Sequence, residues 1–76
     1  MLISPAMHIG QAIRKRMHEL GKSVVCFSRE LPCSRANVYL IFEKSTIDTE
    51  LLMRISILLD YDFFALYSKE MKDRKR

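Results

Sequence analysis

The sequence contains little glycine or proline, only two of each in 76 residues. This scarcity, together with a composition that is 49% hydrophobic and 29% charged, argues against a disordered chain and favours helices joined by short turns. A chain of this length buries only about 60% of its unfolded surface, which leaves room for one core. We therefore expect one all-α domain over residues 1–76, with flexible ends at 1–6 and 72–76.

Long hydrophobic runs are also missing. No stretch approaches the roughly 18 consecutive apolar residues of a membrane span. The segment from Met1 to Ala6 lacks the positive region and long apolar run of a secretory signal. We expect a soluble, cytoplasmic protein with no membrane partner.

Cysteine is equally scarce, and Cys26 and Cys33 are the only two. Together with His8 and His18, which are ordinary polar positions beside the first expected helix, they fit no standard spacing of zinc ligands. We therefore expect no metal and no other cofactor. Cys26 is expected in the core and Cys33 as a free thiol in a turn, which suits a reducing cytoplasm.

Catalytic groups cannot be assembled either, because no nucleophile, base and orienting group occur in a recognisable arrangement. An enzyme is the least expected class. The formal net charge is +4, but residues 69–76 hold five basic and two acidic side chains, which leaves +1 for the rest. A basic end of this kind is commonly only a solubilising segment. Evidence for nucleic-acid binding must therefore come from particular residues.

Five helices follow from the spacing of apolar residues. The first begins near residue 7 and ends at Gly21, and a fourth begins after Asp48, a natural N-cap. A fifth contains an aromatic cluster. The inward faces are expected to comprise Ile9, Ile13, Met17 and Leu20; Val24, Phe27 and Leu31; Val38, Ile41 and Phe42; Leu51, Leu52, Ile55, Leu58 and Leu59; and Phe63, Phe64, Tyr67 and Met71.

The second and third helices are short and are separated only by Pro32 and Cys33. Ser23 and Ser34 are natural N-caps for them, because a serine hydroxyl accepts a hydrogen bond from a free amide of the first turn. So short a turn forces the two helices to cross steeply. The second of the pair then protrudes and can enter a DNA major groove, which is about 12 Å wide.

The residues from Ser23 to Lys44, followed by Ile47 to Leu59, present in order a cap, a small residue, a turn, a second cap and buried aliphatic positions. In this they resemble the Cro and lambda-repressor-like helix-turn-helix proteins, also called the XRE family, over about residues 8–67. The resemblance implies a five-helix lambda-repressor-like DNA-binding domain with its helix-turn-helix at about residues 24–43. It also implies a transcriptional regulator that binds duplex DNA in the major groove.

The family's pattern carries over with two departures. Ser28 stands where family members have a small residue that lets the two helices approach. A glutamine that often follows the first cap, where it braces the DNA backbone, is Val24 here, and the glycine of the turn is Pro32. These departures affect docking on DNA more than the fold.

Five residues are expected to read bases. The resemblance places Arg35 and Ala36 at the family's first base-contacting positions and Leu40 at a later one. The guanidinium of Arg35 matches the O6 and N7 acceptors of guanine, a pairing worth about 1–3 kcal/mol of discrimination. Asn37 could pair with adenine or bond to a phosphate or the local backbone. Tyr39 could reach a phosphate or a thymine methyl, and Ala36 and Leu40 only thymine methyls.

Residues at helix ends are expected to contact phosphates and set the register, and these are Lys22, Ser23, Ser34 and Lys44. Arg14 and Lys15 on the first helix are weaker candidates, because such side chains are more often merely solvated. Arg29 is expected to pair with its neighbour Glu30 or to remain a free surface charge.

Alternatives remain. Paired short helices and serine caps also occur in structural bundles, so the alternative function is a protein-interaction module, such as an antitoxin-like or adaptor subunit. The aromatic cluster of the fifth helix suits either the core or a contact with a second copy. Because one module contacts few bases, DNA binding predicts a homodimer on a two-fold site.

Overall fold

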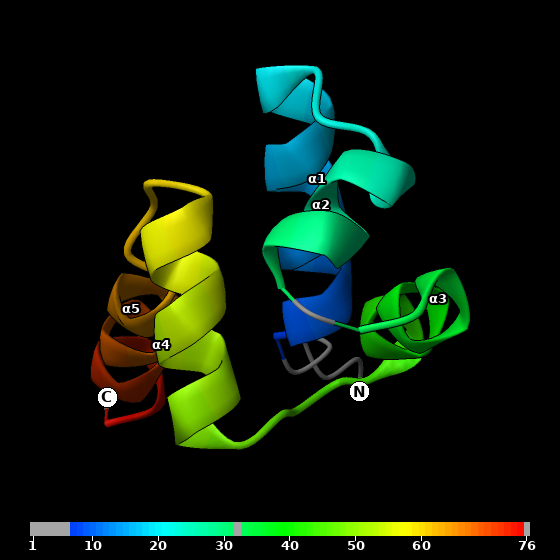
Figure 1. Cartoon of the computed structure of the whole chain (residues 1–76). Coiled ribbons are helices and arrows are strands. Elements are labelled where there is room, and N and C mark those ends of the chain that lie inside the picture. Colours follow the sequence, from blue (N-terminus) through cyan, green and yellow to red (C-terminus); the bar gives the residue numbers. More distant parts are fainter. Residues whose placement is uncertain (1–6, 32, 76) are drawn as a thin grey trace.

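The computed structural model describes residues 7–31 and 33–75, and within them all regular structure is helical (Figure 1). The expected end at 1–6 and Pro32 of the predicted turn lie outside the described residues. Within the same two stretches no helix is both long enough and apolar enough to cross a membrane. The helices are α1 (Ile9–Leu20), α2 (Val24–Glu30), α3 (Arg35–Glu43), α4 (Thr49–Leu58) and α5 (Phe64–Arg74).

The helix boundaries agree with the predicted caps. The side chains of Ser23, Ser34 and Asp48 each accept a hydrogen bond from the backbone N–H three residues along, at 3.0, 3.2 and 3.0 Å. Gly21 ends α1 with a φ of 67°, a left-handed conformation that costs glycine little. The caps predicted from sequence are confirmed, and they explain why α2 and α3 begin where they do.

His8 has a role that the sequence did not reveal. Its Nδ1 accepts a hydrogen bond from the backbone N–H of Gln11 at 3.2 Å, so His8 is the N-cap of α1. Helix α5 extends through Lys72 to Arg74, although the sequence placed these residues in a flexible end.

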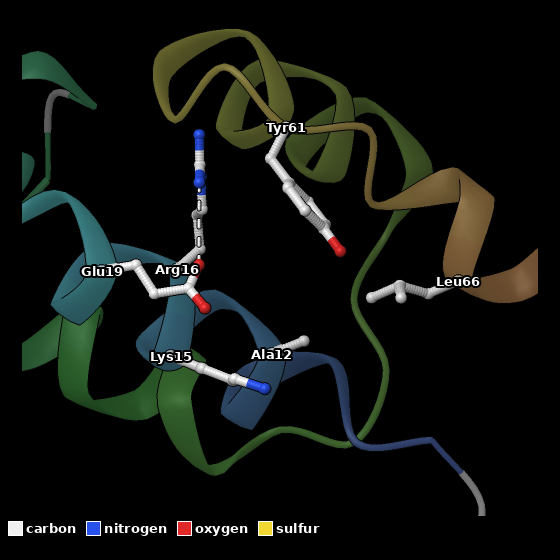
Figure 2. A pocket seen from close by; sticks show the side chains of 6 residues that line it. All are labelled: Ala12, Lys15, Arg16, Glu19, Tyr61 and Leu66. Atoms are coloured by element: carbon white, nitrogen blue, oxygen red, sulfur yellow. Dashed lines mark ion pairs between the residues drawn. The ribbon is translucent and has the colours of Figure 1, made fainter.

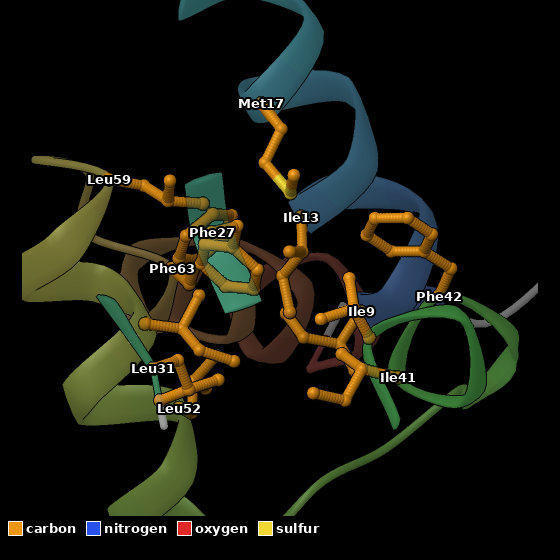
Figure 3. Close-up of a cluster of buried hydrophobic side chains, with 12 residues drawn as sticks. Ile9, Ile13, Met17, Phe27, Leu31, Ile41, Phe42, Leu52, Leu59 and Phe63 are labelled. Atoms are coloured by element: carbon orange, nitrogen blue, oxygen red, sulfur yellow. The ribbon is translucent and has the colours of Figure 1, made fainter. Parts of the chain in front are cut away.

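One hydrophobic core joins the helices, and Figure 3 shows its side chains converging from α1, α2, α3 and α4. It confirms most of the inward positions predicted from periodicity, while Val24, Leu51, Leu58 and Tyr67 are only partly buried. The buried residues are Ile9, Ile13, Met17, Phe27, Leu31, Val38, Ile41, Phe42, Leu52, Ile55, Leu59 and Phe63.

Some core predictions were wrong. Cys26 is exposed, because Phe27 takes the inward position of α2 and its neighbour on the helix turns outward. Leu20 is exposed on the last turn of α1. Phe64 and Met71 are exposed because Phe63, which precedes α5, is the residue that enters the core there.

The start of α1 is joined to the end of α3 by backbone hydrogen bonds. The N–H of Gly10 donates to the carbonyl of Lys44 at 2.9 Å, and that of Ile9 donates to the carbonyl of Ser45 at 3.1 Å. The side-chain amide of Gln11 adds a weaker contact with the carbonyl of Phe42 at 3.4 Å. Free amides at a helix start need acceptors, and these carbonyls supply them. The position of α3 is therefore set by α1.

The turn between α4 and α5 is attached to α1 by Arg16. Its Nε and Nη2 donate to the carbonyls of Leu59 and Asp60 at 3.1 and 3.2 Å. Its guanidinium also lies 5.3 Å from the ring centre of Tyr61, and its ion pair with Glu19 is drawn in Figure 2. Arg16, Glu19 and Tyr61 line a hollow of about 200 Å³ between α1 and the start of α5. Arg16 thus connects the two halves of the chain.

Candidate nucleic-acid interface

Helix α3 buries only one side. Val38, Ile41 and Phe42 face the core, and all five predicted base-reading residues are exposed. Among these, Tyr39 and Leu40 keep 56% and 53% of their surface accessible, which is high for large apolar side chains. The 3.6-residue period accounts for this separation, because three inward positions on a helix of this length leave a wide outer arc.

The five residues do not lie on one line along the helix. Tyr39 lies on the flank toward α1, where its ring packs edge-on against Phe42 with the centroids 6.0 Å apart. Asn37 and Leu40 line a hollow on the opposite flank, toward α4. Helical spacing puts Arg35 on the side of Tyr39 and Ala36 near the middle of the arc. The candidate surface is therefore a broad face with a different chemistry on each flank.

Glu43 is an acidic residue on this face that the sequence did not single out. It is exposed at the last turn of α3, and helical spacing places it in line with Ala36 and Leu40. A carboxylate at this position repels the negatively charged phosphates of DNA, although it can accept a hydrogen bond from N4 of cytosine. Leu40 and Glu43 follow Ala36 by four and seven residues, which is the spacing of one helix face. This spacing could have identified Glu43 as part of the face from the sequence alone.

The two serine caps keep part of their hydrogen-bonding capacity. Both hydroxyl oxygens accept from amides of their own helices. A hydroxyl that accepts one hydrogen bond can still donate its proton. Ser23 and Ser34 are both exposed, so each can donate to a phosphate oxygen without releasing its cap.

The two predicted phosphate-binding lysines differ in their surroundings. Lys22 forms an ion pair with Glu30, and its side chain is only 18% exposed. Of the two alternatives predicted for Arg29, a pair with Glu30 or a free surface charge, the second holds: Glu30 pairs with Lys22, and Arg29 forms no ion pair within the described part of the chain. Lys44 is exposed at the C-cap of α3. Of the two, Lys44 is the more available to a phosphate.

Two residues of α1 join the site from the side. Arg14 and His18, one helical turn apart and both exposed, line a groove of about 300 Å³ with Tyr39, Lys22 and Ser23. The sequence made Arg14 only a weak candidate and gave His18 no role. Their i, i+4 spacing is visible in the sequence, but only the packing of α1 against α3 brings them beside Tyr39.

The basic end of the chain lies away from this face. Figure 1 shows the end of α5 and helix α3 on opposite sides of the molecule. The positive charge of residues 69–75 therefore does not belong to the α3 surface.

Comparisons of the chain with protein-family models, with curated proteins and with solved structures each found no match.

Proposed function

We propose that this chain is a sequence-specific DNA-binding protein, a cytoplasmic transcriptional regulator of XRE type with a lambda-repressor-like fold. It binds duplex DNA as a homodimer, with α3 in the major groove. The observation that carries the proposal is the outer face of α3, which begins at a serine cap, exposes all five candidate side chains and is left uncovered by the described residues.

Four of the five candidate side chains have an evident complementary group on DNA. Arg35 lies in the first turn of α3, the part of a recognition helix that reaches base edges, and its planar donors fit guanine. Ala36 and Leu40 supply apolar contacts for thymine methyls. Tyr39 stands beside Arg14 and His18, where phosphates would pass. Base contacts specify the sequence, while phosphate contacts position the protein.

The test is selection of bound sequences from a random duplex pool with the wild type, Arg35→Ala and Arg74→Ala. Arg74 lies at the end of α5, so its replacement removes the same charge far from α3. We expect Arg35→Ala to lose preference at one guanine per half-site, worth about 1–3 kcal/mol, and Arg74→Ala to keep it. An unchanged preference in Arg35→Ala would refute Arg35 as a base reader.

A second candidate function has its own support. The hollow between α3 and α4 has a volume of about 470 Å³ and is lined by Leu31, Leu40, Ile41 and Leu51 among others. Exposed, mainly apolar surface with a polar rim suits a protein partner, as in an antitoxin-like or adaptor subunit. Salt separates the two functions, because affinity for duplex DNA falls steeply as salt rises. Failure to bind any duplex at low ionic strength would favour the interaction module.

A further inference from the structure

The groove between α1 and α3 is lined by side chains that suit an anion. It has a volume of about 300 Å³, and its polar residues are Arg14, His18, Lys22, Ser23 and Tyr39. No carboxylate is among the described residues that line it. Guanidinium, ammonium and hydroxyl groups all donate hydrogen bonds, and those from charged donors to a phosphate are the strong ones. The groove therefore favours a negatively charged ligand.

Arg14 and His18 are the side chains of the groove that remain available to such a ligand. Both are exposed, and neither forms an ion pair with another described residue. They are four residues apart on α1, so their Cβ atoms lie about 5–6 Å apart and one phosphate group can contact both. Lys22 is less available, because it forms an ion pair with Glu30 and its side chain is only 18% exposed. The charge that an anion meets in the groove thus depends on Arg14 and His18.

Within the groove, no described carboxylate faces His18. Its neighbour Glu19 pairs with Arg16 at 3.6 Å and lines, with Lys15, the hollow toward α5 instead. The titratable side chain that α3 contributes to the groove is Tyr39. The charged residues of α2 and α3 do not line it, and these are Arg29, Glu30, Arg35 and Glu43. A positive charge on His18 is therefore left to be balanced by an anion from outside the protein.

We infer that this groove binds a phosphate of the DNA backbone and that protonation of His18 strengthens the contact, so that affinity for duplex DNA rises as the pH falls below neutrality. The inference rests on the proposed function, in which α3 enters the major groove and the flank that carries Tyr39 faces the backbone beside it. It adds a dependence on pH to that function.

The direction of the pH dependence follows from the charges. An imidazole is neutral above its ordinary pKa of about 6.5 and positive below it. A backbone phosphate stays negative over the whole range from pH 5 to 8, so it attracts the protonated imidazole more than the neutral one. Binding therefore takes up a proton, and a lower pH favours the complex. Arg14 keeps its charge throughout this range, so it contributes at every pH.

The experiment measures the anisotropy of a labelled mixed-sequence duplex from pH 5.5 to 7.5 at constant low ionic strength. The variants are His18→Gln and the matched control His8→Asn, since these are the only two histidines of the chain. Asparagine is a good N-cap, so His8→Asn removes the other imidazole and keeps a cap on α1. We expect the wild type to bind about fivefold more tightly per bound chain at pH 5.5 than at pH 7.5. His18→Gln should lose most of this gain, and His8→Asn should keep it.

Arg14→Gln provides a second, independent measurement. It removes the permanent charge of the groove, so it should weaken binding at every pH and leave the gain at low pH in place. Arg14 and His18 are both exposed, and far-ultraviolet circular dichroism should show the helix content of the wild type in each variant.

The outcomes separate this inference from the proposed function. An affinity that does not change with pH overturns the inference, as does a gain at low pH that His18→Gln keeps or that His8→Asn loses. Each of these results includes a bound duplex, so each leaves the proposed function standing. A chain that binds no duplex even at pH 5.5 contradicts the proposed function, and this inference falls with it.

Discussion

The Cα of Gly10 lies directly against the backbone of Phe42, where the end of α3 meets the start of α1. A Cβ added at Gly10 would stand 2.3 Å from the carbonyl oxygen of Phe42 and 2.4 Å from that of Ile41. Real Cβ atoms do not come this close to backbone oxygens. Because Gly10 has no side chain, the start of α1 comes close enough for its free N–H groups to donate to the carbonyls of Lys44 and Ser45, just after α3. These hydrogen bonds fix the position of α3.

Gly10→Ala should therefore destabilise the protein. Alanine favours a helix by about 1 kcal/mol over glycine, but backbone atoms must move to admit the methyl group, and overpacking typically costs about 1–3 kcal/mol. We expect a net loss of stability in urea unfolding. Gly21→Asn is the control, since Asn tolerates the left-handed conformation and no heavy atom lies within 4 Å of a Cβ there. A Gly10→Ala protein as stable as the wild type would contradict the close approach.

Replacing Arg16 should loosen the attachment of the α4–α5 turn. Arg16→Ala removes two hydrogen bonds to carbonyls 43 and 44 residues away, and the contact with Tyr61. Hydrogen bonds to charged groups contribute about 1.5–3 kcal/mol when shielded, and partial exposure here reduces this to about 1–2 kcal/mol. Thermal unfolding measures the effect.

The matched control for Arg16 is Arg14→Ala, which removes an exposed arginine from the same helix. Its effect on stability should be within about 0.5 kcal/mol. Arg16→Lys keeps the charge but lacks the fork of donors, so it should recover only part of the loss. Equal stability of Arg16→Ala and Arg14→Ala would show that the contacts of Arg16 contribute nothing.

Glu43→Gln should strengthen binding to duplex DNA if α3 enters the groove. The change removes a negative charge from the exposed face and keeps the size of the side chain. We expect affinity to rise several-fold at low salt, and the gain to shrink as salt screens the phosphates. Asp73→Asn, on α5, is the control and should leave affinity nearly unchanged. Fluorescence anisotropy with a labelled duplex gives both values, and a weaker Glu43→Gln complex would indicate that Glu43 itself contacts a base.

Ser34→Ala should destabilise α3 and, if α3 is the DNA-reading helix as proposed, weaken binding to duplex DNA. Loss of an N-cap costs about 0.5–2 kcal/mol, because the amide of Asn37 loses its acceptor. Ser68→Ala, at an exposed position within α5, should change stability little. Urea unfolding and duplex binding are measured on both variants. If Ser34→Ala were neutral in unfolding, the cap would not be what determines the start of α3.

Local sequence signals predicted the helices because they act within a few residues. A serine or aspartate accepts from an amide three residues along, as at Ser23, Ser34 and Asp48, and apolar periodicity separates the inward face of α3 from its outer face. The same period predicted that the candidate base-reading residues would be exposed. Their role in binding DNA remains a prediction.

Tertiary structure decided what depends on residues far apart in the chain. From sequence alone Arg16 is one more solvated cation, and only packing brings it to the carbonyls of Leu59 and Asp60. Likewise, Cys26 and Phe64 have apolar side chains that are nevertheless exposed, because the neighbouring Phe27 and Phe63 occupy the core instead. Periodicity in the sequence shows that a helix has an inward face. The packing of neighbouring elements then decides which apolar residues at the border of that face are buried, because a protein core is close-packed.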